Sequence, residues 1–392
     1  MHIPDYFEFY NKTKINSGKD ALENIPYELE SMNAVKPLVI TDKKSVKNGM
    51  VKALIKSFYN SGVTIGAVYD EVPGYASSAL LQNLSKLFRD RGCDSIIAMG
   101  GDAAASAAKG LNILVSNKTD SLLMFEDMTK SAPLKPFIFI PSSEARGTET
   151  SNEAVIDSRI YKSDDLFPDL VLIDKRMLKW TEKSNTASSA MLALTQAIEA
   201  CTFSESNPVN DAFAYASIEL VYENLSKALK CHCNKKEKSG FMNGVAISGI
   251  VYSNAPEGLA RAIGFEMEKM TGHPAGLCAG LVLPYSLDYK FRFEKTGVRG
   301  ELLLPLAGIE NYCAIHESER AEKSVELLYL LIDNLEGVIP GRIKDMNIPM
   351  YMIKKIAEAA EARGGGKYSK GAALKILEHA YEGIPFKGGK SK

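Results

Sequence analysis

Short apolar runs alternate with amphipathic segments along the first half of the chain. Strands that alternate with helices are typical of a parallel sheet with crossover helices, and ligands of such sheets bind beyond the carboxyl ends of the strands. We therefore predict an α/β fold for this half. The expected strands are residues 37–42, 64–70, 94–100, 136–141 and 170–174.

The hydrophobic pattern changes in the second half. From about residue 185 onward, apolar residues recur at the spacing of one helix face. The longest segments of this kind are residues 185–203, 210–229, 242–255, 321–337 and 350–366. The stretch 175–187 between the two patterns is polar and irregular. We predict an α/β domain over 1–182 and an all-helical domain over 183–392.

Composition narrows the functional classes. Lys and Arg number 47 and Asp and Glu number 48, so the formal net charge is −1. A near-neutral chain has no electrostatic footprint for nucleic acid or an anionic membrane. No run approaches the ~18 apolar residues of a membrane span, and the first residues lack the layout of a secretory signal. We expect a cytoplasmic protein.

The six cysteines do not suggest a disulfide framework. They are scattered over a long chain, which suits reduced thiols. Cys231, His232 and Cys233 form a metal-like triplet, but no second Cys/His pair follows at the spacing of a structural zinc site. We interpret the triplet as an exposed helix end in a lysine-rich stretch.

Several segments, in order, resemble the iron-dependent (group III) alcohol dehydrogenases over essentially the whole length. The segments are VITDKKSVKNGMV, SIIAMGGDAAASAAKGL, FIFIPSSEARGTETSNEAVI, PDLVLIDKRML, LALTQAIEACTF, SNA at 253–255 and AGLVLPYSLDYK. The resemblance implies a Rossmann-like nucleotide-binding domain followed by a helical domain, as in the related dehydroquinate synthase-like fold. It also implies a cleft between the domains that holds NAD(P) and a catalytic metal.

The resemblance also locates the metal ligands, and this chain departs from them. The family holds its metal with an Asp and a His four residues apart on one helix and with two further His. The matching positions here are Leu192, Gln196, Arg261 and Ala275, and an additional active-site His becomes Phe265. Leu and Ala cannot ligate, and an arginine repels a dication. We expect no catalytic metal at this place.

A shifted metal site is the alternative. His273 and Glu257 lie near the expected positions and, with Gln196, could form a substitute ligand set if the local register changes. The competing interpretation is a loop histidine and a solvated glutamate.

The segment that resembles the phosphate-binding turn is altered too. The family sequence Gly-Gly-Gly-Ser becomes Gly100, Gly101, Asp102 and Ala103. Backbone N–H groups at such a turn cradle pyrophosphate, and the Asp102 carboxylate would oppose it. Either Asp102 caps the following helix itself or it contacts a ligand. Further along that helix, Ser106 replaces a family aspartate and Lys109 is kept.

The segment that resembles the nicotinamide loop keeps its paired hydroxyls, Ser142 and Ser143, but places Glu144 and Arg146 where the family has small residues. Asp42 is retained at the end of the first strand. There it either accepts hydrogen bonds from a ribose diol, which favours NAD over NADP, or caps the next helix. We expect no metal cofactor; the retained Asp42 favours NAD, but the altered turn and loop argue against its binding.

These departures suggest a pseudoenzyme, which keeps the fold for binding, scaffolding or regulation. It would act as a homodimer, through an edge strand near residues 6–15, or with an active paralogue, and could hold a small molecule in the interdomain cleft. The alternative is a metal-independent NAD(P)-linked oxidoreductase, for which maleylacetate reductases look like a precedent. In it, Arg261 would replace the metal charge and Arg146 would contact an anionic carbonyl substrate. A conventional dehydrogenase with a shifted metal site, or an unrelated reaction, is the third hypothesis.

Overall fold

Two compact units make up the chain. The computed structural model describes residues 3–119, 132–142, 145–178, 183–203, 206–229, 235–294, 297–335 and 337–386. The α/β unit consists of Tyr10–Thr181 and Asn234–Gly249, and the helical unit consists of Met1–Phe9, Glu182–Cys233 and Ile250–Lys392. Neither unit is one continuous stretch of sequence. Our single boundary after residue 182 stays a prediction.

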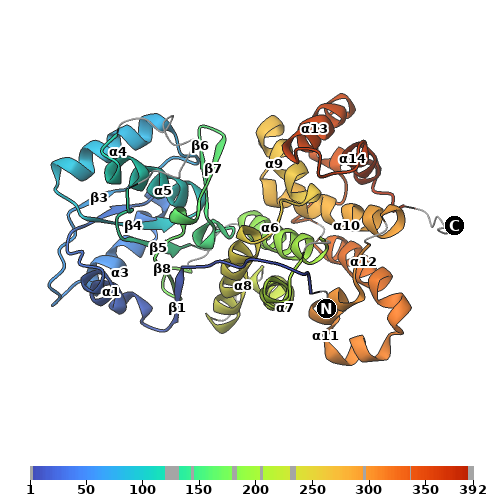
Figure 1. Ribbon diagram of the computed structural model, residues 1–392, viewed down its shortest axis with the longest axis horizontal. Helices are drawn as coiled ribbons and strands as arrows, with labels where there is room; N and C mark the ends of the chain where they lie inside the picture. The colour runs from blue at the N-terminus through green and yellow to red at the C-terminus, as the bar shows by residue number, and fades with distance from the viewer. Residues whose placement is uncertain are drawn as a thin grey trace. The chain divides into compact units, whose positions relative to one another are not determined.

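A sheet of six parallel strands forms the centre of the α/β unit (Figure 1). In spatial order the strands are β1 (Lys14–Gly18), β8 (Leu170–Asp174), β5 (Phe137–Pro141), β4 (Ser95–Gly100), β2 (Pro37–Ile40) and β3 (Ala67–Tyr69). The five strands expected from the apolar runs are confirmed. The apolar pattern did not predict β1, because it is a largely exposed edge strand of mixed polarity.

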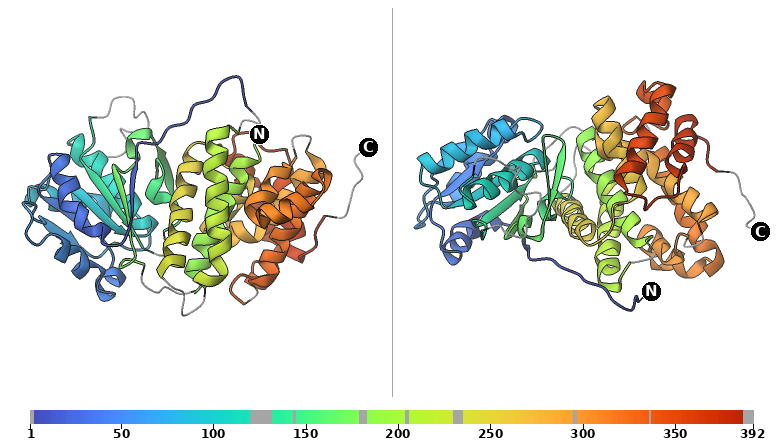
Figure 2. Two further views of the ribbon diagram at one scale, coloured as in Figure 1. Left: turned by 90° about the horizontal axis from the view of Figure 1, so that it is seen from below. Right: turned by 45° about the horizontal axis from the view of Figure 1, so that its top comes forward.

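Helices cover both faces of this sheet (Figure 2). On one face, α1 (Ile25–Ser31) and α3 (Met50–Ser57) pack against inward-facing residues of β2, β4, β5 and β8. On the other face lies α5 (Asp102–Ser116), which packs against α4 (Ser78–Asp90). Strands of a sheet that is buried on both faces appear in the sequence as continuous apolar runs. The central strands could therefore be predicted from the sequence.

Shorter elements complete the α/β unit. They are α2 (Lys43–Lys47), the antiparallel hairpin of β6 (Glu153–Ile156) and β7 (Arg159–Lys162), and the 3₁₀ turns η1 (Ala21–Asn24), η4 (Thr148–Thr150) and η5 (Asp164–Leu166). The sequence analysis did not predict the hairpin.

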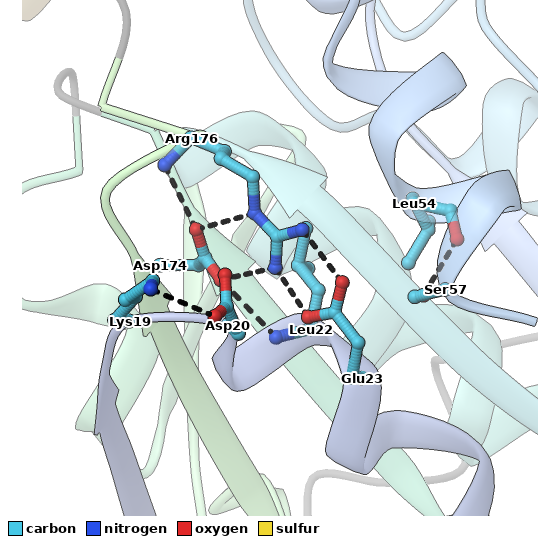
Figure 3. Close-up of polar contacts among 8 residues, drawn as sticks. All are labelled: Lys19, Asp20, Leu22, Glu23, Leu54, Ser57, Asp174 and Arg176. Carbon is cyan, nitrogen blue, oxygen red and sulfur yellow. Dashed lines mark hydrogen bonds and ion pairs between the residues drawn. The ribbon is translucent and has the colours of Figure 1, made fainter.

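An ion-pair network joins the end of β8 to η1 (Figure 3). The buried Asp174 carboxylate accepts hydrogen bonds from the backbone N–H of Leu22 at 3.2 Å and from Arg176 Nε at 2.9 Å. Arg176 Nη1 also donates to Glu23 at 2.7 Å. Two turns that are distant in sequence are therefore held together at the carboxyl end of the sheet.

The helical unit contains the remaining helices. They are α6 (Lys183–Cys201), α7 (Pro208–Ala228), the end of α8 (Lys235–Ser253), α9 (Leu259–Thr271), α10 (Ala275–Phe293), α11 (Leu303–Ala314), α12 (Glu317–Asn334), α13 (Met350–Arg363) and α14 (Ala372–Glu382), with η6 (Gly300–Leu302) and η7 (Ile343–Met346). The five helical segments expected from periodicity are confirmed as α6, α7, α8, α12 and α13. α6 and α10 are buried on nearly all sides, as expected for central helices.

Glycines permit close approach between these central helices. A Cβ atom on Gly276 of α10 would lie 1.9 Å from the carbonyl oxygen of Ser188 on α6. A Cβ atom on Gly264 of α9 would lie 2.7 Å from the carbonyl oxygen of Ala275. The three helices therefore pack backbone against backbone. Within the described ranges, no helix is both long and apolar enough to span a bilayer.

Candidate functional site

The turn after β4 places an acidic side chain at the start of α5. Gly101 occupies the N-cap position and Asp102 is the first helical residue. The Asp102 carboxylate accepts a hydrogen bond from Thr148 Oγ1 at 2.6 Å and pairs with Arg146 Nε at 2.6 Å. The expected role of Asp102 as the cap is therefore wrong, because its side chain turns to the loop after β5 instead. A carboxylate in the first turn also interacts favourably with the helix dipole.

Gly100 and Asp42 lie together at the carboxyl ends of β4 and β2. Asp42 caps α2 by accepting a hydrogen bond from the backbone N–H of Ser45 at 2.7 Å. Gly100 has a φ of +142°, and a Cβ atom there would lie 3.0 Å from Asp42 Oδ2. The capping interpretation of Asp42 is confirmed, and ribose binding by the same carboxylate stays a prediction.

The loop after β5 is tied to the turn after β4. The backbone N–H of Ser142 donates to the carbonyl of Gly100 at 2.9 Å. Ser143 and Glu144 lie outside the described residues. Arg146 extends to Asp102, so the bulky residue that replaces a small one in this loop neutralises the carboxylate in the turn.

Lys109 and Glu149 are both buried beneath this loop. Lys109 Nζ donates to the carbonyl oxygens of Thr148, Ser151 and Glu153 at 2.7–2.8 Å. Burial lowers the pKa of Lys109 to about 7, against the opposite effect of nearby carboxylates. Burial likewise raises the pKa of Glu149 to about 7. Lys109 thus holds η4 and the following residues on α5, which is a structural role.

The positions that the resemblance assigns to the family's metal ligands are buried on α6, α9 and α10. Leu192, Gln196, Arg261 and Ala275 are each at most 5% exposed. Leu192 and Ala275 offer no ligand atom, and Arg261 adds a fixed positive charge. The side chains at these four positions do not fit a divalent cation.

Arg261 is part of a cluster that satisfies its charge internally. We define the Arg261 cluster as Tyr252, Glu257, Arg261, Phe265 and Arg363. The Arg261 guanidinium carbon lies 3.7 Å from the ring centroid of Tyr252 and 4.4 Å from that of Phe265. Arg261 Nη1 pairs with Glu257 Oε1. Cation–π contacts and a carboxylate partner together compensate for burying this guanidinium.

Glu257 is shared between two arginines. Arg363 Nε donates to Glu257 Oε2 at 2.8 Å, and Arg363 Nη2 donates to Oε1 at 3.1 Å. Arg363 Nη1 also lies 3.6 Å from Glu266 Oε1. Glu257 is therefore not the solvated glutamate of the sequence interpretation. The sequence analysis missed Arg363, because no sequence signal connects it with a residue 106 positions earlier.

Two of the three candidate ligands of the shifted metal site, His273 and Glu257, have other partners. His273 Nε2 lies 2.9 Å from the carbonyl oxygen of Met346, and both carboxylate oxygens of Glu257 face guanidinium groups. In the part of the chain that the structure describes, no group of three or more His, Cys, Asp or Glu residues has metal-binding geometry. Cys231, His232 and Cys233 lie outside those residues.

Glu199 was also missed by the sequence analysis. It sits one turn after Gln196 on α6 and accepts hydrogen bonds from the backbone N–H groups of Ala260 at 2.7 Å and Arg261 at 3.2 Å. Its carboxylate therefore satisfies the first turn of α9, where Gly258 leaves room for it. Burial raises the pKa of Glu199 to about 7.

Known proteins share this fold and sequence pattern over most of the chain. A family model described as Iron-containing alcohol dehydrogenase matches residues 12–175, and one described as Fe-containing alcohol dehydrogenase family, C-terminal, matches 186–377. The 1,3-propanediol dehydrogenase of Klebsiella pneumoniae is 23% identical over 353 residues, which cover 88% of this chain and 89% of that protein.

Solved structures confirm the predicted fold. The crystal structure of a 1,3-propanediol oxidoreductase has a TM-score of 0.86 at 20% identity, covering 96% of this chain and 100% of that chain. A sulfoacetaldehyde reductase from Bifidobacterium kashiwanohense, solved in complex with NAD⁺, has a TM-score of 0.83 at 18% identity and covers 96% of this chain and 99% of that one. At these identities the likeness establishes the fold alone.

Proposed function

The chain belongs to the iron-containing alcohol dehydrogenase family, and we propose that it is a pseudoenzyme within it, a non-catalytic binding or scaffold protein. Alcohol oxidation in this family needs a Lewis acid to stabilise the alkoxide while hydride leaves. The observation that carries the proposal is the Arg261 cluster. A guanidinium with its own carboxylate and two aromatic rings stands at one of the four ligand positions.

The dinucleotide site supports the same proposal. The Asp102 carboxylate lies at the start of α5, where the family resemblance places pyrophosphate, and Arg146 pairs with it. A phosphate group there would be repelled by Asp102 at close range. Binding would also require Arg146 to leave its carboxylate partner.

The protein would then act through association rather than turnover. We propose a homodimer, or a complex with an active member of the same family. The altered metal and dinucleotide positions would then stabilise the fold, and the protein surface would bind the partner.

Titration with NADH tests the cofactor part of the proposal. The fluorescence of NADH should show no saturable change with the full-length protein up to about 1 mM, the upper end of usual KM values. Incubation with NAD⁺ and primary alcohols should form no NADH above the buffer rate. Saturable binding together with alcohol-dependent NADH formation would overturn the proposal.

A metal-independent NAD(P)-linked reductase is the second candidate, because two guanidiniums, Arg261 and Arg363, converge on one carboxylate, Glu257. Release of that carboxylate would free positive charge for an anionic carbonyl compound. In support, one protein of the same fold is a sulfoacetaldehyde reductase, solved in complex with NAD⁺. This candidate predicts NADH binding without metal, and NADH consumption when a small keto acid or anionic aldehyde is added.

A further inference from the structure

A small cavity of about 70 Å³ lies inside the helical unit, and none of the four metal-ligand positions lines it. Its wall includes Glu199 and Phe203 at the end of α6, Lys290 near the end of α10, and Tyr368. A cavity needs at least roughly 10–15 Å³ to hold one water, so this volume holds a few water molecules or a compound of a few non-hydrogen atoms. The cavity therefore selects for small ligands.

Lys290 is the unusual residue in this wall. Among the residues described, no hydrogen bond or ion pair engages its Nζ atom, which lies 5.0 Å from the ring centroid of Phe203. Burial lowers the pKa of Lys290, although the carboxylates of Glu294 and Glu199 act in the opposite direction. A larger share of this amine is therefore neutral, and hence nucleophilic, than of a solvated lysine.

The remaining wall favours a neutral ligand over an anion. Two acidic residues, Glu199 and Glu294, offset the two lysines that line the cavity, Lys290 and Lys367. No net positive field remains to attract a carboxylate or phosphate. The wall also includes Ser286, whose hydroxyl can donate to a carbonyl oxygen.

We propose that Lys290 forms a Schiff base with small aldehydes or ketones that enter this cavity. The amine nitrogen attacks the carbonyl carbon, and a C=N bond replaces the C=O bond. The oxygen leaves as water with both amine hydrogens, so nothing is oxidised or reduced. This reaction does not involve the metal or dinucleotide positions. It would let the protein bind small carbonyl compounds covalently.

Reductive trapping tests the proposal on the full-length chain. The protein is incubated with propionaldehyde and cyanoborohydride, and the alkylation of each lysine is followed by peptide mass spectrometry. Lys290 should react measurably faster than the exposed Lys269, because it lines the cavity and burial lowers its pKa. In the Lys290→Met variant, labelling at Lys269 should be unchanged.

A larger aldehyde distinguishes reaction inside the cavity from a lysine that reacts with any aldehyde. Benzaldehyde exceeds the cavity, so the preference for Lys290 over Lys269 should disappear with it. Equal rates at the two lysines with propionaldehyde, or the same preference with both aldehydes, would overturn the proposal. Because this readout needs neither NADH nor metal, its failure would leave the proposed pseudoenzyme role untouched.

Discussion

Loss of the Glu257 carboxylate should lower the free energy of unfolding more than loss of the Arg261 guanidinium. Glu257 keeps Arg363 when Arg261 is removed, whereas removal of the carboxylate affects two guanidiniums at once. Arg261→Met should therefore cost about 1–3 kcal/mol of unfolding free energy, from lost cation–π contacts and a charged hydrogen bond. Glu257→Gln should cost about 3–5 kcal/mol, as expected when a buried charge loses its counterion.

Urea denaturation of the two variants and the wild type measures this difference. The order of the two losses is the critical result. If Glu257→Gln were tolerated better than Arg261→Met, the Arg261 cluster would not be the stabilising arrangement described here.

Asp102 should control the affinity of the α5 turn for phosphate. Asp102→Gly restores the residue type of the family and removes the carboxylate that opposes pyrophosphate. We expect it to make NADH binding saturable below about 1 mM, where the wild type shows none, and a ten-fold gain in affinity is equivalent to about 1.4 kcal/mol. The ion pair with Arg146 is partly exposed, so the cost in stability should stay within about 1 kcal/mol.

Fluorescence titration with NADH measures the affinity, with Asp90→Asn as the matched control. Asp90 is an exposed acidic residue at the end of α4 in the same unit. An equal gain in the control, or no gain in Asp102→Gly, would show that the Asp102 carboxylate is not the obstacle.

Residue identity alone supports part of the site prediction. Leucine and alanine side chains carry no ligand atom, so Leu192 and Ala275 cannot themselves hold a metal wherever they lie. The partners of Arg261 and Asp102 could not be inferred, because they come from distant segments. Two examples are Arg363, from a helix more than a hundred positions away, and Thr148, from the loop after β5.

At the scale of elements, the packing of α6 against α10 leaves no room at Gly276. A Cβ atom there would lie 1.9 Å from the Ser188 carbonyl oxygen, so the backbones must separate. Gly276→Ala should lower the unfolding free energy by about 1–3 kcal/mol. Gly341→Ala, whose Cβ would meet nothing within 4 Å, should change it by less than about 0.5 kcal/mol. Equal stability of the two variants in thermal or urea unfolding would contradict this packing.

The junction between β8 and η1 should weaken in acid. Burial alone would raise the pKa of Asp174, but the hydrogen bonds from Arg176 and Leu22 hold it below its ordinary value. A carboxyl with a depressed folded pKa stabilises the fold above its unfolded pKa of about 3.9, and this contribution disappears as the pH falls through the folded pKa. The wild type should therefore exceed Arg176→Met in stability at pH 7, and the gap should shrink towards pH 3.

Unfolding free energies at several pH values measure this gap. A gap that stays constant down to pH 3 would mean that the Asp174 carboxylate does not carry the linkage. An Arg176→Lys variant, which keeps the charge but not the forked geometry, should recover part of the difference at neutral pH.

Some elements could be predicted from periodicity and others could not. The central strands and the amphipathic helices α12 and α13 carry clear patterns, because each has a defined buried face. The hairpin of β6 and β7 and the edge strand β1 are short and partly exposed, so they carry little pattern. α10 is apolar on nearly all sides and contains Pro284, which obscures its helical period.

At the scale of the whole molecule, the order of the segments was more informative than any single motif. The fold and the family could be predicted from it. The sequence did not predict which segments form each unit. Residues 1–9 belong to the helical unit and residues 234–249 belong to the α/β unit, although each lies in the other half of the sequence. Function follows less directly than fold, because it depends on the residues at the reactive positions, and the departures expected there stay a prediction.

Metal content of the purified full-length protein, measured after incubation with ferrous iron or zinc and desalting, decides whether the helical unit holds a catalytic metal. We expect a sub-stoichiometric amount that does not change in the Glu257→Gln or His273→Ala variants. One equivalent of iron or zinc for each chain, lost when Glu257 or His273 is replaced, would overturn the proposed pseudoenzyme.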